Sequence, residues 1–127
     1  RDCIFTPAPA HTFADKPPID RIDAEKAFLS NNPETIIDAL ERITFFDTSP
    51  FYIQEKCIKH LKSDNIDIQI QAITSTGYLA LLHGKLDKDK VIPLIESLSK
   101  NPALTQLAKD TLEDIKDNLQ VRRRSDD

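Results

Sequence analysis

The sequence predicts an all-helical protein, and three observations lead to this fold class. The 127 residues include only two glycines, whereas turn-rich β-folds depend on glycine for positive φ angles. A proline follows directly after Asn or Ser at 32–33, 49–50 and 101–102, which is typical of helix starts. The stretch from Ile68 to Gly84 contains no Asp, Glu, Lys or Arg, in a chain that is 30% charged. Because a helix without a broad polar face is buried on most sides, we expect a central helix here, covered by neighbours on several sides.

The chain divides into an arm, a single domain and a tail. Residues 1–20 hold four prolines and no helical period, so we expect an extended or a disordered arm. In the extended form, Ile4, Phe5 and Phe13 dock on the helices. One helical domain is expected over residues 21–119, and a frayed charged tail over residues 120–127.

The first half of the domain contains three predicted helices. A short one covers Asp23–Leu29 and ends at the polar run 30–32. The second begins at Asn32-Pro33 and carries apolar residues at helical spacing, namely Ile36, Ile37, Leu40 and Ile43. The third begins at Ser49-Pro50.

The second half is predicted to hold the central helix and two more. The central helix follows a polar turn at 63–65 and ends at Gly84. Residues 66–71 also alternate with the period of a strand, but no partner strand is evident, so we predict helix. Asp87 or Asp89 caps the next helix, with Pro93 in its first turns, and Asn101-Pro102 begins the last helix.

Two pairs of predicted helices repeat each other. The offset is 37 residues in the first helix of each pair, from Ile58 to Ile95, and 36 in the second, from Ala72 to Ala108. A period near forty built from two antiparallel helices is typical of stacked helical arrays.

Residues 57–82, and again 91–115, resemble HEAT repeats. They share apolar pairs that end in a short polar turn, followed by a second helix with a small residue, Ala72 or Ala108, at its packing point. The resemblance covers residues 50–119, with a degenerate repeat before them. It implies a short right-handed α-solenoid of about three antiparallel helix pairs. The chain departs from the family where many repeats place a ladder of Asp and Arg, since Gln69 and Gln71 occupy the region of the Arg. Tetratricopeptide and ankyrin signatures match less well.

Charge and cysteine content limit the classes of function. The net charge is −4, and a mildly acidic body argues against non-specific binding of nucleic acid. The central apolar stretch is too polar and too short to span a membrane. Two cysteines make no disulfide framework and we expect no targeting segment, so a cytoplasmic protein is expected. We also expect a monomer.

We predict neither an enzyme nor a cofactor. Cys57 and His60 lie one helical turn apart, but a zinc site needs more ligands, which Cys3 and His11 in the arm would have to supply. The same two residues are the one candidate thiol–base pair, without a glycine-rich turn for an oxyanion hole or a P-loop. We expect a half-buried thiol, a solvated imidazole and no metal site.

The predicted function is that of a protein-binding module. Helical arrays bind partners in a groove lined by the second helix of each pair. We expect the partner-binding residues to be Gln71, Ser75, Tyr78, Asp110, Glu113, Asp114 and Asp117. The aromatic residues Phe45, Phe46 and Tyr52 are reserve anchors, that is, second candidates for contact with the partner. The alternative is that they fill the space between the first two helices.

The resemblance also suggests a more specific role. Small acidic HEAT-like proteins of this size resemble bacterial immunity proteins, which block a cognate toxin domain that is often a basic nuclease, as in contact-dependent growth inhibition. The alternatives are a generic adaptor, an accessory subunit of an enzyme such as a pigment lyase, or a HEAT-like DNA glycosylase.

Overall fold

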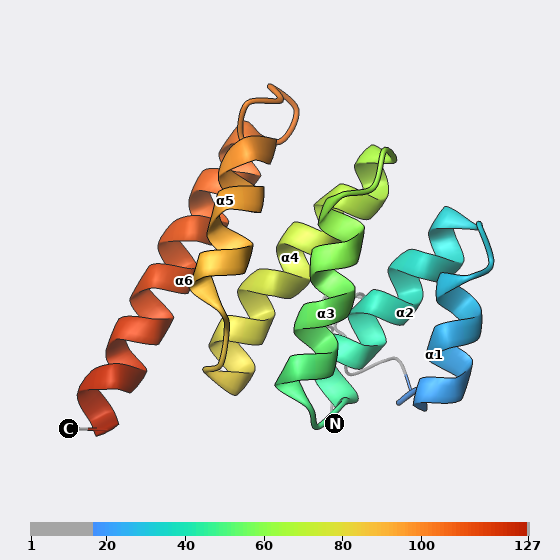
Figure 1. Ribbon diagram of the computed structural model, residues 1–127, viewed down its shortest axis with the longest axis horizontal. Helices are drawn as coiled ribbons and strands as arrows, with labels where there is room; N and C mark the ends of the chain where they lie inside the picture. The colour runs from blue at the N-terminus through green and yellow to red at the C-terminus, as the bar shows by residue number, and fades with distance from the viewer. Residues whose placement is uncertain (1–16, 127) are drawn as a thin grey trace, which may run out of the picture.

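The computed structural model describes residues 17–126, and side chains over 17–119; within these residues it is all-α, with six helices and no strand (Figure 1). The predicted fold class is therefore confirmed. Residues 66–71 are helical, so their period-two pattern does not indicate a strand. The predictions for Cys3, Ile4, Phe5, His11 and Phe13 lie outside the described residues.

The helices follow one another with short connections. Their bounds are α1 Arg21–Phe28, α2 Pro33–Phe46, α3 Pro50–Leu61, α4 Ile66–His83, α5 Lys88–Leu98 and α6 Thr105–Asp126. The four residues before α1 are not helical, and Arg42 on α2 donates hydrogen bonds to the carbonyls of Pro17 and Pro18, at 2.9 and 3.1 Å.

Most helix ends follow the local chemistry that the sequence predicts. The Asn32 side chain accepts from the amides of the first turn of α2, Ser49 does so for α3 and Asn65 for α4. Gly84 ends α4 in the left-handed region, at φ 66°, and its amide donates to the carbonyl of Ala80.

The two ends of α6 differ from the prediction. Asn101 does not start the α-helix, because its side chain and carbonyl accept from Ala103 and Leu104 in a tight turn, and α6 begins only at Thr105. At the other end the helix continues to Asp126, so the backbone of 120–126 is helical where a frayed tail was predicted.

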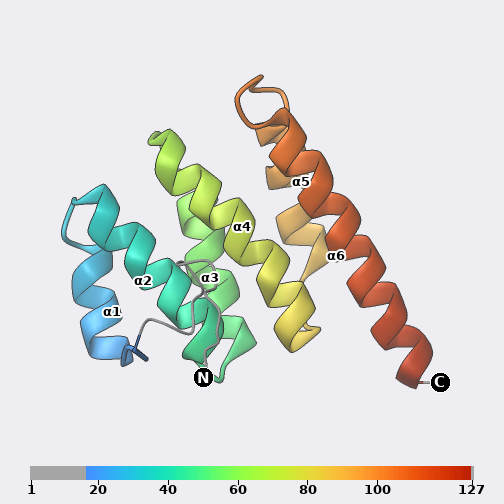
Figure 2. The same cartoon turned by 180° about the vertical axis from the view of Figure 1, so that it is seen from behind.

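Successive helices run in opposite directions and lie in two layers (Figures 1 and 2). One layer contains α1, α3 and α5; the other contains α2, α4 and α6, and the outer surface of this second layer is called the even-helix face below. Helix α4 lies between α2 and α6 and also packs on α3, so it is the central helix. Its buried residues Ile73 and Ala80 join a core cluster with α5 and α6.

The central helix is not covered on all sides. Four large apolar residues on it are partly exposed, with exposed fractions of 38–46%: Ile66, Ile70, Leu81 and Leu82. The physical reason is the two-layer arrangement, because α2, α3 and α6 cover three sides of α4 and its fourth side is part of the even-helix face.

Candidate functional site

The exposed side of α4 is an unusual surface. Four residues of α4, the middle helix of the even-helix face, are apolar and yet partly exposed; Ile66, Ile70, Leu81 and Leu82 are called the α4 strip below. From Ile68 to Gly84 this helix also carries no charged residue. The residues of the strip form two apolar pairs, one near each end of α4, and we take these exposed pairs as candidate contacts for a partner.

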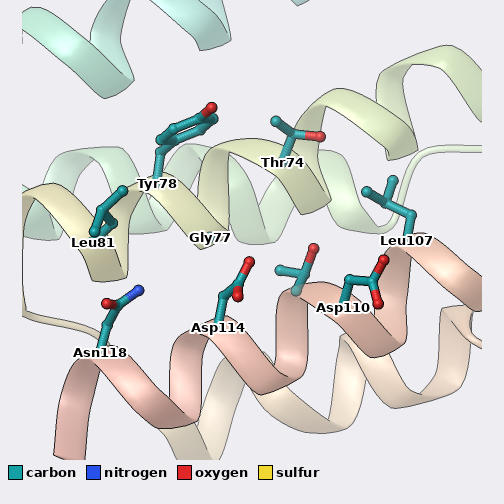
Figure 3. Close-up of a pocket in the computed structure, with 9 residues that line it drawn as sticks. Thr74, Gly77, Tyr78, Leu81, Leu107, Asp110, Asp114 and Asn118 are labelled. Atoms are coloured by element: carbon teal, nitrogen blue, oxygen red, sulfur yellow. The ribbon is translucent and has the colours of Figure 1, made fainter. Parts of the chain in front are cut away.

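A pocket lies beside this strip, between α4 and α6 (Figure 3). Its volume is about 470 Å³, which is in the range of pockets that hold small ligands. Helix α4 supplies Thr74, Gly77, Tyr78 and Leu81, and helix α6 supplies Leu107, Asp110, Thr111, Asp114 and Asn118.

Gly77 allows this close approach of the two helices. A Cβ atom at this position would lie 3.3 Å from Cγ2 of Thr111, which is tighter than an ordinary contact. Glycine in a helix interior costs about 1 kcal/mol relative to alanine, and at this position it accompanies the close contact with Thr111. The missing side chain leaves room for Thr111, which lines the pocket.

Two carboxylates face the space between the helices. Asp110 and Asp114 lie one turn apart on α6, are exposed, and project toward α4 (Figure 3). Gln106 donates a 2.9 Å hydrogen bond to Asp110, and within residues 17–119 neither carboxylate forms an ion pair. Like charges at this spacing destabilise a helix by about 0.2–0.5 kcal/mol, so the two carboxylates are not explained by the stability of α6.

Tyr78 borders the pocket from the other side. Its side chain leans from α4 toward α2 (Figure 3), where its ring meets that of Phe45 with centroids 5.0 Å apart and planes at 59°. It therefore joins α2 to α4 across the even-helix face and forms a rim of the pocket.

The structure brings together part of the predicted site. Tyr78, Asp110 and Asp114 line the pocket, whereas Glu113 and Asp117 do not. Successive residues of a helix point about 100° apart, so Glu113 points away from the direction of Asp114.

Two predicted residues on α4 lie elsewhere. Ser75 is buried, with 1% exposed, and its hydroxyl accepts a 3.0 Å hydrogen bond from Gln71, so expecting Ser75 to line a surface groove was wrong. The half-buried Gln71 is held by this bond and does not line the pocket. The prediction also missed pocket residues, of which Gly77 carried a signal, since glycine is rare inside helices.

Cys57 is a core residue. It is fully buried, and burial raises the pKa of its thiol to about 12 against the opposing effect of a hydrogen bond with Thr76. The prediction of a half-buried thiol was wrong, and this thiol is neither accessible nor ionised at neutral pH.

His60 is also buried, where a solvated ring was predicted. Its Nδ1 lies 2.8 Å from the carbonyl oxygen of Lys56, and its ring packs on Phe28 at 5.0 Å. Burial lowers the pKa of His60, more than the Lys56 carbonyl raises it. Within the described part of the chain, no group of three or more His, Cys, Asp or Glu residues is arranged to hold a metal ion.

A polar network explains Tyr52, one of the reserve anchors. Its hydroxyl donates a 2.6 Å hydrogen bond to Glu25, which also pairs with Lys56 at 2.8 Å. Arg21 lies over the Tyr52 ring at 4.5 Å and pairs with Asp47 at 3.0 Å. Hydrogen bonds from Lys56 and then Tyr52 hold the pKa of Glu25 below its ordinary value. The network fastens α1 to α3, so Tyr52 has a structural role.

No helix among residues 17–126 combines the length and the apolar character needed to cross a membrane. Comparison of the chain with models of protein families, with curated proteins and with solved structures found no match.

Proposed function

We propose that this protein is a binding module for a basic protein partner, built as a short HEAT-like array of three antiparallel helix pairs. The proposal for the architecture is supported by the two layers, the alternating helix directions and the 36- to 37-residue repeat in the sequence. In such arrays the second helices of the pairs provide the binding surface, and here these are α2, α4 and α6.

One observation carries the proposal. The α4 strip exposes apolar side chains on the middle helix of the even-helix face, and Asp110 and Asp114 on α6 line a pocket with one of them, Leu81, without an ion pair among residues 17–119. An apolar centre with charge at its edge is the usual anatomy of a protein interface. The negative charge of Asp110 and Asp114 at this edge favours a cationic partner, because opposite charges favour encounter and like charges oppose it.

The most specific form of the proposal is an immunity protein that blocks a basic, nuclease-type toxin domain. The small size, the net charge of −4 and the HEAT-like resemblance support this role. A nuclease needs a cationic surface to bind nucleic acid, and an acidic face placed against that surface would exclude the substrate.

The experiment takes the products of the neighbouring genes as candidate partners and tests any that carry a basic, nuclease-type domain. Nuclease activity is measured with increasing amounts of this protein, and association rates are measured by stopped flow at low and high salt. We expect saturable inhibition, and we expect Asp110→Lys with Asp114→Lys to slow association about tenfold or more at low salt. The effect should shrink at high salt, because salt screens the field.

The matched control reverses two acids that do not line the pocket, Glu96 on α5 and Glu113 on α6. It changes the net charge by the same amount, so a purely global effect of charge would slow both variants equally. A pocket variant that associates as fast as its control, at both salt concentrations, would contradict the proposed face.

A further inference from the structure

The geometry points to the α4–α6 pocket as the receptor for one arginine side chain of the partner, held between Asp110 and Asp114. This inference rests on the proposed function, because it names the group that the even-helix face recognises. Three features of the pocket carry it: a buried hydroxyl without a hydrogen bond to the described residues, two carboxylates without an ion pair among residues 17–119, and an apolar lining.

The buried hydroxyl belongs to Thr111. This residue lines the pocket, is 6% exposed, and its hydroxyl forms no hydrogen bond within the described residues. The other two buried threonines donate to carbonyls of their own helices, Thr44 to Leu40 at 2.6 Å and Thr76 to Ala72 at 2.7 Å. A buried polar group is normally satisfied, so the hydroxyl of Thr111 offers a hydrogen-bonding group that a ligand in the pocket can satisfy.

The carboxylates indicate the charge of that ligand. Asp110 and Asp114 project toward α4 on either side of Thr111 in the sequence, and no cation among residues 17–119 pairs with them. A guanidinium group has five N–H donors in a planar fork, so it can donate to two carboxylates and a hydroxyl together. An ammonium group carries its charge on one atom and matches the two acids less well.

The remaining lining suits the aliphatic part of the same side chain. Leu81 and Leu107 border the pocket with their apolar side chains, and an arginine buries its methylene stem along such a surface. A metal ion fits less well, because the described residues offer no group of three or more His, Cys, Asp or Glu. The combination of two acids, a hydroxyl and apolar walls therefore favours an organic cation.

The test is a titration of the full chain, labelled with ¹⁵N, with the capped tripeptide acetyl-Gly-Arg-Gly-amide, followed by amide chemical shifts. We expect saturable shifts confined to residues 74–81 and 107–118. The same peptide with citrulline, which has the shape of arginine without its charge, should bind at least about tenfold more weakly, because its hydrogen bonds are not charge-assisted.

Three variants locate the interaction. The double variant Asp110→Asn, Asp114→Asn should bind the arginine peptide about three- to tenfold more weakly. The matched pair Glu96→Gln with Glu113→Gln should leave its affinity unchanged. Thr111→Val should weaken the peptide without lowering the thermal midpoint of unfolding, since it removes an unsatisfied hydroxyl and keeps the shape of the side chain. If Thr111 had only a structural role, the substitution would lower the thermal midpoint and leave the affinity for the peptide unchanged.

Equal binding of the arginine and citrulline peptides, shifts spread over the acidic surface, or no shifts would each overturn the inference. The titration contains no protein partner, so its failure differs from failure of the proposed function. If the peptide fails but reversal of Asp110 and Asp114 slows a basic domain, only the arginine pocket is lost. If the peptide binds and no basic domain does, the pocket stands and the proposed partner is wrong.

Discussion

Gly77→Ala tests how closely α4 and α6 are packed at the pocket. Alanine is more favourable than glycine in a helix interior by about 1 kcal/mol. The new Cβ would lie 3.3 Å from Cγ2 of Thr111, so the Thr111 side chain must shift by a few tenths of an ångström. Overpacking of this kind costs about 1–3 kcal/mol. Taking about 2 kcal/mol for the crowding, we expect the free energy of unfolding to fall by about 1 kcal/mol.

A second substitution, at Thr111, completes a double-mutant cycle that measures the crowding directly. Thr111→Ser removes the crowded methyl group and should cost about 1 kcal/mol by itself, through lost burial. In the Thr111→Ser background, Gly77→Ala keeps the gain in helix propensity and loses the clash, so it should raise the free energy of unfolding by about 1 kcal/mol. The coupling energy of the cycle is then about 2 kcal/mol.

The assay is urea denaturation of the four proteins followed by circular dichroism at 222 nm, with the free energies extrapolated to water. Additive effects of the two substitutions would refute the reasoning, because they would mean that Gly77 and Thr111 do not compete for the same space. A stabilised single variant Gly77→Ala would refute it as well.

Three further predictions concern the core, a buried histidine and the pocket acids. Ile73→Asp and Leu79→Asp should each abolish cooperative unfolding, because an unpaired buried carboxylate costs several kcal/mol, and a parent-like melt of either would contradict the central role of α4. The pKa of buried His60 lies below its ordinary value of 6.5, so the unfolded chain takes up the proton first; the free energy of unfolding should fall as the pH drops below 6.5, and His60→Gln should flatten this slope in urea titrations. An unchanged slope in His60→Gln would count against its burial. Asp114→Asn should keep or slightly raise the thermal midpoint, since it relieves repulsion from Asp110 worth about 0.2–0.5 kcal/mol, and a clear drop would indicate a structural ion pair instead.

The helix boundaries were predictable where they depend on local chemistry. The caps at Asn32, Ser49 and Asn65 and the left-handed Gly84 act within four or five residues of chain, so the sequence is sufficient to recognise them. The start of α6 was not predictable in this way. Asn101 has the same cap chemistry but closes a separate tight turn, and no local signal distinguishes the two uses.

The pocket was only partly predictable, because it depends on packing between helices distant in sequence. Asp110 and Asp114 could be proposed from their charge, and Gly77 carried a signal as a glycine inside a helix. That Gly77 faces Thr111 depends on how α6 lies against α4. Ser75 was misassigned for a related reason, since its polar character suggested exposure, whereas the Gln71 side chain satisfies its hydroxyl where it is buried.

The central claim is that a basic partner binds to the even-helix face, and hydrogen exchange measured by mass spectrometry tests it most directly. Exchange is compared for the full chain alone and in complex with a basic nuclease domain that it is found to inhibit in the experiment above. The account predicts slower exchange in peptides from 66–82 and 105–118, which contain the α4 strip and the pocket, with no change in α3 and α5. Protection confined to α3 and α5, with 66–82 and 105–118 exchanging as in the free protein, would contradict it.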